Sequence, residues 1–315
     1  MIIISHKTAF QFWRAYRASV DPYRIKDAQQ AFASPSPSSK EALAELERLG
    51  FAPSEKTPVD LLFFGRDARM KTVWARPHAI LDELPRGSLV QLSDHVAIVS
   101  PELCFVQMAG ICTREQTVLV GFELCGTYAQ LGSKRTLAER SHLTSVKQIG
   151  AILRKLPRTH TSRAAAALAF VLDGAASPME AKLAMLLTLP TSWGGYALPQ
   201  PRMNVPIQLG EAASTVYPRS HCRADLFWPD ARFDVEYDGE EFHEGDAHAK
   251  DVARLAALAM EDVTVLEVAW AQVADPAKFH GVATVVARKL GQRLRIRRDD
   301  FVVRCTHLRE QLELA

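Results

Sequence analysis

The sequence predicts an α/β protein, and three observations indicate this class. Helical periodicity with capping residues and glycine stops recurs along the chain. Short apolar or alternating stretches bounded by turn residues lie between the helical stretches. From residue 176 onward the elements read helix, three strands, helix, strand, helix. The length of 315 residues favours two domains, each large enough to bury a core.

The predicted domains differ in how regularly their elements are ordered. We expect residues 1–145 to form a mixed α+β accessory or recognition domain, residues 146–300 to form a second domain with leading helices, and residues 301–315 to form a C-terminal tail. The first domain is expected to contain a helix "KEALAELERLG", strands within "VDLLFFG", "KTVWARPHAI" and "SLVQLSDHVAIVS", and helices "SPELCFVQMAGI" and "EQTVLVGFELCGTYA".

Composition excludes several classes of protein. Hydrophobic residues make up 48% and charged residues 23% of the chain, as in ordinary globular proteins, and a net charge of +2 indicates no partner by itself. The five cysteines have no CxxC spacing, which favours reduced thiols and a cytoplasmic location. The start reaches Lys7 too early for a signal peptide, and no apolar run is long enough to cross a membrane.

In the second half, capping residues and apolar periodicity define each element. Ser177 and Pro178 begin the helix "SPMEAKLAMLLTL", and Asp275 begins the helix "DPAKFHGVATVVARKLG". Between them lie the strands "NVPIQL", "CRADLFW" and "RFDVEYD", the helix "AHAKDVARLAALAME" and the strand "VTVLEVAW". The turn "PDA" joins the second and third of these strands into a hairpin.

This hairpin and the segment after it, residues 223–246, carry nine acidic residues among twenty-four, although strands are poor in carboxylates. If the turn centres on residues 230 and 231, Asp225 lies opposite Glu236, and strand alternation places Asp238 on the same face as Glu236. Three clustered carboxylates are costly without a cation, and oxygen-only ligands favour Mg²⁺ or Mn²⁺. The sequence therefore predicts a divalent-metal site on this strand pair.

The same residues resemble a known family. Glu180 on its helix, "RADLFWPDARFDVEYDGEEFH", "KDVARLAAL" and "VTVLEVAW" together resemble the PD-(D/E)XK nuclease superfamily, and more narrowly its very-short-patch-repair-like endonuclease branch, over residues 176–297. The resemblance implies a restriction-endonuclease-like αβββαβ fold and Mg²⁺-dependent hydrolysis of DNA. It makes Asp225 and Glu236 metal ligands, with Glu180 as an assisting acid, Asp238 in the position where many members have lysine, and His243 as a proton carrier or phosphate contact.

Several of these residues also have structural interpretations. Glu180 completes a capping box with Ser177, Asp238 can begin a turn at Gly239, and His243 can be a surface histidine. Asp251 and Arg254 are spaced for a salt bridge on one helix. The chain also departs from the family pattern, because Glu267 stands where relatives often carry arginine and Asp262 where they carry glycine.

A second charged feature is basic. Residues 288–298 contain six basic residues in eleven, and alternation in "RLRIR" predicts a strand that presents three arginines on one face. This strip is either a solvated edge strand or a phosphate-binding surface. The residues that we expect to contact nucleic acid are Lys250, Arg254, Arg293, Arg295 and Arg297.

These observations predict a Mg²⁺-dependent DNA endonuclease. The alternatives are a non-catalytic DNA-binding regulator or antitoxin on a degenerate nuclease fold, and an interaction scaffold that binds no nucleic acid. The segments "SPELCFVQMAG" and "GFELCGTYA" are similar to abortive-infection antitoxin proteins, which implies a partner from a toxin–antitoxin or repair system. DNA is the expected ligand in the first two hypotheses. The sequence contains no nucleotide-binding or protease motif that would favour another function.

Overall fold

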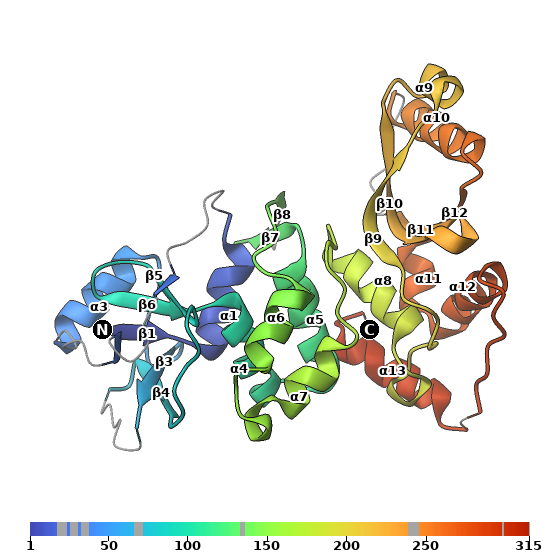
Figure 1. The fold of residues 1–315 in the computed structure, drawn as a ribbon. Coiled ribbons are helices and arrows are strands. Elements are labelled where there is room, and N and C mark those ends of the chain that lie inside the picture. The colour runs from blue at the N-terminus through green and yellow to red at the C-terminus, as the bar shows by residue number, and fades with distance from the viewer. Residues whose placement is uncertain are drawn as a thin grey trace. The chain divides into compact units, whose positions relative to one another are not determined.

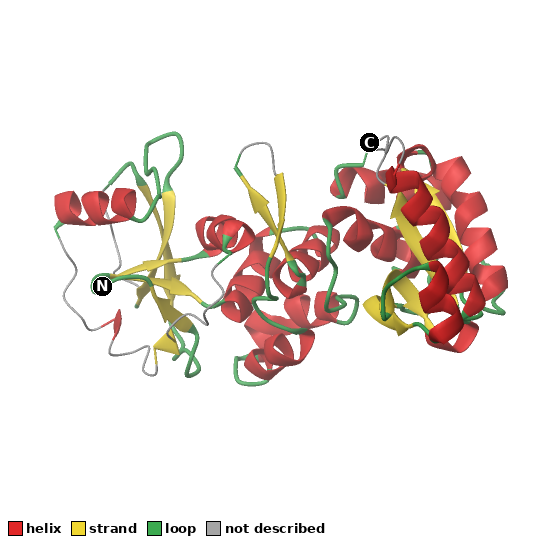
Figure 2. Ribbon diagram, turned by 90° about the horizontal axis from the view of Figure 1, so that it is seen from above, coloured by secondary structure: helices red, strands yellow, loops and turns green. Residues whose placement is uncertain are grey.

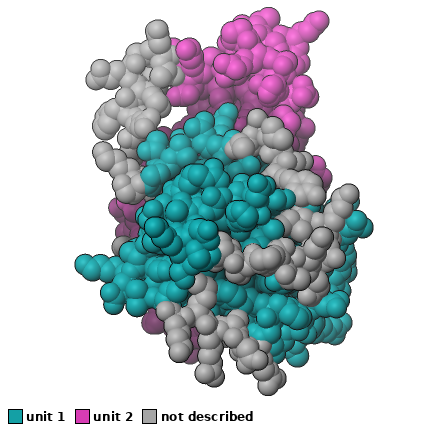
Figure 3. All heavy atoms as spheres, turned by 90° about the vertical axis from the view of Figure 1, so that its left-hand side faces the viewer, with its two compact units in different colours: residues 1–169 teal, residues 170–315 magenta. Residues whose placement is uncertain are grey.

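The computed structural model describes residues 1–17, 24–25, 31–32, 38–65, 72–132, 136–238, 246–297 and 299–314. The chain is a mixed α/β protein that divides into two compact units, Met1–Ala169 and Phe170–Ala315 (Figure 3). The expected boundary at residue 145 is therefore too early. The helices α6 (Val146–Leu153) and α7 (Arg158–Leu168) belong to the first unit because they pack against α4 (Pro101–Ile111).

Unit 1 is built on a six-stranded mixed sheet with strand order β2-β5-β6-β1-β3-β4 (Figure 1). The apolar start of the chain supplies its central strand, which pairs in parallel with β6 and antiparallel with β3 and is buried throughout. The strands are β1 (Ile2–Ile4), β2 (Arg24–Ile25), β3 (Val59–Phe64), β4 (Ala75–Ile80), β5 (Leu89–Gln91) and β6 (Val96–Val99).

The helices of unit 1 begin where the sequence places capping residues. The Ser100 side chain accepts a hydrogen bond from the backbone of Leu103 at the start of α4, and Thr113 forms a capping box with Gln116 at the start of α5. The α5 helix ends at Cys125, and the rest of the segment expected as helix enters a small hairpin. The remaining elements are α1 (His6–Ala15), α3 (Ser39–Arg48), α5 (Arg114–Cys125), β7 (Tyr128–Leu131) and β8 (Thr136–Glu139).

Unit 2 contains a four-stranded sheet with order β12-β11-β10-β9. Its strands lie among helices (Figure 2). Its antiparallel hairpin of β10 and β11 is extended by β9 on one side and by the parallel strand β12 on the other. The helix α8 packs on β10 and β11, and α10 packs on β12 and α9. These elements are α8 (Pro178–Thr188), β9 (Arg202–Gln208), α9 (Glu211–Val216), β10 (His221–Trp228), β11 (Phe233–Asp238), α10 (Asp246–Met260) and β12 (Thr264–Ala269).

The predicted order of helix, three strands, helix, strand, helix is present in unit 2. Two short helices are added to it: α9 lies between β9 and β10, and α11 (Trp270–Ala274) lies between β12 and α12 (Pro276–Lys289). Two expectations fail beyond α12. Residues 292–297 form no strand, although Arg293, Arg295 and Arg297 remain exposed. Residues 301–315 are not a loose tail, because they contain the helix α13 (Phe301–Gln311) with Cys305, Leu308 and Arg309 buried.

A glycine fixes α13 to the rest of unit 2. Gly194 has a φ of 94° at the end of the short 3-10 helix Thr191–Trp193, and a Cβ there would lie 2.3 Å from the backbone oxygen of Arg304. Cys305 donates to the oxygen of Gly194 at 3.3 Å. Only glycine allows this approach of the two backbones, and neither partner carried a sequence pattern that predicted it.

Candidate active site

The hairpin of β10 and β11 brings two acidic side chains opposite each other. Leu226 pairs with Val235 and Trp228 with Phe233, and the same register places Asp225 opposite Glu236. The turn occupies Pro229–Ala231 and is closed by Arg232 in a left-handed conformation with a φ of 46°. The register that the sequence predicted is therefore confirmed.

The helix α8 supplies a third carboxylate. The Ser177 hydroxyl accepts a hydrogen bond from the backbone N–H of Glu180 at 3.1 Å, which is half of the predicted capping box. The other half is different, because the Glu180 carboxylate accepts from the backbone N–H of Ala176 at 2.9 Å and from the side-chain amide of Asn204. Asn204 comes from β9 and has a φ of 51°, so a kink in the edge strand ties that strand to Glu180.

Asp225 lies in an unfavourable electrostatic environment. The hydrogen bond that its carboxylate accepts from the backbone of Tyr237 is long, at 3.4 Å. Burial, followed by repulsion from Glu180 and Glu236, raises the pKa of Asp225 to about 7. Carboxylates from one helix and two strands therefore converge at the half-buried Asp225.

Asp234 belongs to the same group, although sequence reasoning did not select it. Its Oδ1 accepts from the backbone N–H of Leu226 at 3.1 Å, while its buried Oδ2 has no hydrogen-bond partner among the described residues. Burial and then the neighbouring Glu236 raise the pKa of Asp234 well above its usual range. The alternation of acids along "FDVEYD" was the signal that could have included it.

One cation reaches this group from α10. The Arg254 guanidinium donates from two nitrogens to the two carboxylate oxygens of Glu236, and also to the backbone oxygen of Arg223 at 2.7 Å. Burial lowers the pKa of Arg254, but the hydrogen bonds and charge of Glu236, with the charges of Asp225 and Asp234, together outweigh that effect and raise it. The ion pair expected between Arg254 and Asp251 on the helix surface is thus replaced by one with Glu236.

The predicted cluster of Asp225, Glu236 and Asp238 is present only in part, and the two predicted metal ligands, Asp225 and Glu236, lie opposite each other. Asp238 is exposed, and the charges that act on Asp225 come from Glu180 and Glu236 instead. Within the described ranges, no group of three or more His, Cys, Asp or Glu side chains is arranged to hold a metal ion. The donor set still fits a hard divalent cation chemically, because it consists of carboxylates and includes the unpartnered Oδ2 of Asp234.

The remaining predicted residues are spread around this group. His243 lies outside the described residues. Lys250 is exposed on α10, while Arg293, Arg295 and Arg297 are exposed after α12. Glu267 pairs with Glu236 across β11 and β12, and its pKa is raised by partial burial and by Glu236.

Comparison of the chain with protein-family models, curated proteins and solved structures finds no match. In the part of the chain that the structure describes, no helix is long and apolar enough to cross a membrane. The support for the candidate site is therefore its geometry alone.

Proposed function

We propose that unit 2 is a nuclease-like domain that hydrolyses phosphodiester bonds in DNA with Mg²⁺ or Mn²⁺. The observation that carries this proposal is the convergence of Glu180 and Glu236 on the half-buried Asp225, where burial and then the repulsion of these two carboxylates raise the pKa to about 7. Protein interiors rarely gather buried carboxylates without a compensating ligand, and perturbed carboxyl groups concentrate at functional sites.

Each acid has a role in this proposal. Asp225 and Glu236 would hold the divalent ion, and Glu180, anchored by Ala176 and Asn204, would assist them from α8. The metal, when bound, supplies Lewis acidity for a water nucleophile and for the charge that develops on the phosphate. The exposed side chains of Lys250, Arg293, Arg295 and Arg297 would attract the DNA backbone, in a cytoplasmic setting.

A specific observation favours a second function, a DNA-binding regulator on a degenerate nuclease fold. Arg254 already neutralises Glu236 through a two-pronged ion pair, so the cluster holds an internal cation in the position that a metal ion would compete for. A protein partner from a toxin–antitoxin or repair system belongs to this second function.

Incubation of the intact chain with supercoiled DNA in Mg²⁺, Mn²⁺ or EDTA separates the two functions. We expect metal-dependent nicking or linearisation that Asp225→Asn abolishes. The matched control is Asp230→Asn, which removes a carboxylate from the exposed tip of the same hairpin and should leave cleavage unchanged. Salt-sensitive DNA binding without cleavage in any metal would support the regulator instead.

Arg254 provides a second arm of the test. Arg254→Gln removes the internal cation from Glu236, so the concentration of Mg²⁺ needed for half-maximal cleavage should fall if metal and guanidinium compete. If Arg254→Gln remains inactive at all Mg²⁺ concentrations while it still binds DNA, the nuclease proposal is wrong.

A further inference from the structure

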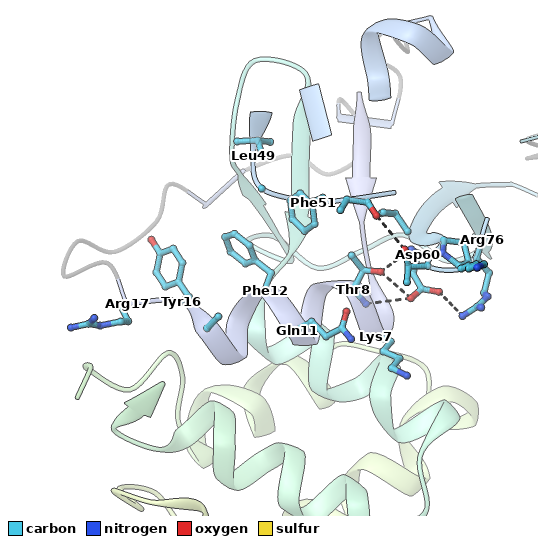
Figure 4. A pocket seen from close by; sticks show the side chains of 17 residues that line it. Lys7, Thr8, Gln11, Phe12, Tyr16, Arg17, Leu49, Phe51, Asp60 and Arg76 are labelled. Atoms are coloured by element: carbon cyan, nitrogen blue, oxygen red, sulfur yellow. Dashed lines mark hydrogen bonds and ion pairs between the residues drawn. The ribbon is translucent and has the colours of Figure 1, made fainter. Parts of the chain in front are cut away.

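Unit 1 contains a cavity of about 650 Å³ beside the N-terminal helix (Figure 4). It is lined by α1, by the segment 49–58 that follows α3, and by the adjoining parts of β3 and β4. Its volume lies in the range of small-molecule sites. Nothing in the proposed nuclease function uses this cavity, and the inference below does not rest on that function.

The lining of this cavity is strongly basic. Lys7, Arg17, Lys56 and Arg76 line it, against a single acidic residue, Asp60. No carboxylate of the described residues lies within 4.0 Å of the amino groups of Lys7 or Lys56. Arg76 reaches Asp60 at 3.4 Å and leaves 57% of its side chain exposed. The cavity therefore carries positive charge that its own side chains do not neutralise.

Asp60 offsets only one of these four positive charges, and its carboxylate is held below the surface. It accepts hydrogen bonds from the backbone and hydroxyl of Thr8 at 3.2 and 3.1 Å, and contacts His78 Nε2 at 2.8 Å. Thr8 also accepts from the Asp60 backbone at 2.9 Å. This reciprocal set fixes the first turn of α1 to β3 and makes the floor of the cavity rigid.

Aromatic rings form the other wall. Phe12 and Phe51 stack with centroids 5.8 Å apart and an interplanar angle of 22°. Tyr16 lies against Phe12 at a centroid distance of 5.5 Å. Figure 4 shows Phe12 and Phe51 side by side, and Gln11 and Lys7 extend from α1, the helix that also carries Phe12. All three rings are only half-buried, so part of their faces remains available to a ligand.

We propose that this cavity binds an unpaired nucleotide, with its base against the Phe12–Phe51 wall and its phosphate on Lys7, Lys56 and Arg76. A flat aromatic wall beside unneutralised cations is the combination by which proteins bind single-stranded nucleic acid. Gln11, exposed at the same edge, adds a side-chain amide able to bond a base or sugar. An acidic peptide would use the cations but would leave the aromatic wall without a matching partner.

The ligand chemistry, a base with a phosphate, can come from a free nucleotide or from a single strand. Fluorescence anisotropy of a short fluorescein-labelled oligothymidylate with the intact chain, in EDTA, measures the second source directly. Unlabelled dTMP, oligouridylate, duplex DNA and polyglutamate are added as competitors. We expect oligothymidylate and oligouridylate to compete well, and duplex DNA and polyglutamate to compete at least tenfold less well.

Two pairs of variants locate the binding. Phe51→Leu should weaken oligothymidylate binding about tenfold, whereas Phe51→Tyr, which retains the ring, should bind like the wild type.

The second pair tests the lysines. The double variant Lys7→Gln and Lys56→Gln should make the slope of log K against log salt concentration shallower by about 1.4, since each lost contact with a single strand removes about 0.7. Lys40→Gln with Lys147→Gln removes the same charge from exposed positions of unit 1 outside the cavity, and should leave the slope unchanged.

The outcomes are distinct. Tight competition by dTMP alone, with sensitivity to Phe51→Leu, supports the free nucleotide as the source of the same chemistry. Equal loss for Phe51→Leu and Phe51→Tyr, equal competition by polyglutamate, or no effect of the lysine pair would overturn the proposal. Circular dichroism melts of the variants show whether each one is folded, and the lysine pair, exposed on the surface, tests the site even if Phe51→Leu unfolds.

Discussion

Each unit of this protein places a carboxylate between a helix and a sheet, buried in unit 1 and half-buried in unit 2, and the surroundings of the two carboxylates have opposite effects. Asp60 in unit 1 is 3% exposed, and Thr8 and His78 contact its oxygens. Burial alone would raise its pKa, but the hydrogen bonds from His78 and Thr8 outweigh burial and lower it. Asp225 in unit 2 accepts one long backbone hydrogen bond and faces two further carboxylates, so burial and then their repulsion raise its pKa to about 7.

The difference is the one expected between a structural acid and an acid that binds a ligand. A buried carboxylate whose hydrogen bonds are all supplied by the fold stabilises the native state and needs no ligand. A buried carboxylate surrounded by like charge is destabilising until a proton or a cation arrives, and the fold must compensate for it elsewhere. Unit 1 therefore uses its acid to position a helix, whereas in unit 2 Asp225 accepts only one long hydrogen bond from the described residues.

The largest expected effect concerns the structural acid. Asp60→Asn places an amide N–H₂ among donors from Thr8 and His78, so we expect a loss of about 3 kcal/mol or more in the free energy of unfolding of unit 1. Chemical denaturation followed by tryptophan fluorescence measures it. In contrast, Asp225→Asn should leave metal-free unit 2 as stable as the wild type or more stable. If both variants destabilise the protein equally, the distinction between the two acids fails.

The sequence predicted unit 2 better than unit 1 for a physical reason. In unit 2 the capping residues, the alternation and the short turn around residues 230 and 231 are local signals, and together they set the register that places Asp225 opposite Glu236. In unit 1 the floor of the cavity joins Thr8 to Asp60 and His78, which lie far apart along the chain. No local sequence pattern predicts such a contact.

The same limit applies to the details of the candidate site. The two-pronged pair of Arg254 with Glu236 joins a helix to a strand, so the sequence suggested only the local spacing of Arg254 with Asp251. Asn204 could not be selected, because its contact with Glu180 depends on a kink in β9 with a φ of 51°. Periodicity predicts which face a residue occupies, whereas tertiary packing decides which neighbour it meets.

The second largest effect is a pH dependence of opposite sign in the two units. The folded-state pKa of Asp225, about 7, exceeds the reference value of 3.8, so its contribution to stability is fully present below pH ~4 and is lost as the pH rises through 7. We expect unit 2 to lose on the order of 3 kcal/mol between pH 4 and pH 8 from this group. Asp234, whose pKa is also raised, acts in the same direction.

Asp60 has the opposite sign. Its folded-state pKa is lowered, so its contribution is present above the unfolded value and is lost as the pH falls through the folded one. Calorimetry of the wild type below pH 4 checks Asp60, and differential scanning calorimetry of the wild type and Asp225→Asn between pH 4 and 8 checks Asp225. The difference between the two proteins should grow with pH in the transition of unit 2 alone. A constant difference across this range would contradict the assignment of Asp225.

A divalent ion should replace the proton in unit 2. On the proposed function, Mg²⁺ or Mn²⁺ at 100 times its Kd stabilises unit 2 by about 2.7 kcal/mol, because the ion binds only the folded cluster. Asp225→Asn should lose this gain, and the surface variant Asp230→Asn should keep it. The transition of unit 1 should not move with metal. Equal stabilisation of all three proteins would mean that the ion binds elsewhere.

The smallest effect separates the two roles of Glu180. Gln at this position retains one acceptor for Ala176 or Asn204, so Glu180→Gln should change the stability of unit 2 by only about 1 kcal/mol. It also removes a charge that raises the pKa of Asp225, so the pH at which unit 2 loses stability should move downward. Glu211→Gln, in the first turn of the exposed α9, removes a carboxylate from another helix start and should leave that pH unchanged. A fall in stability with no movement of the pH dependence would make Glu180 a helix cap alone, and the acidic cluster would then consist of the hairpin carboxylates without α8.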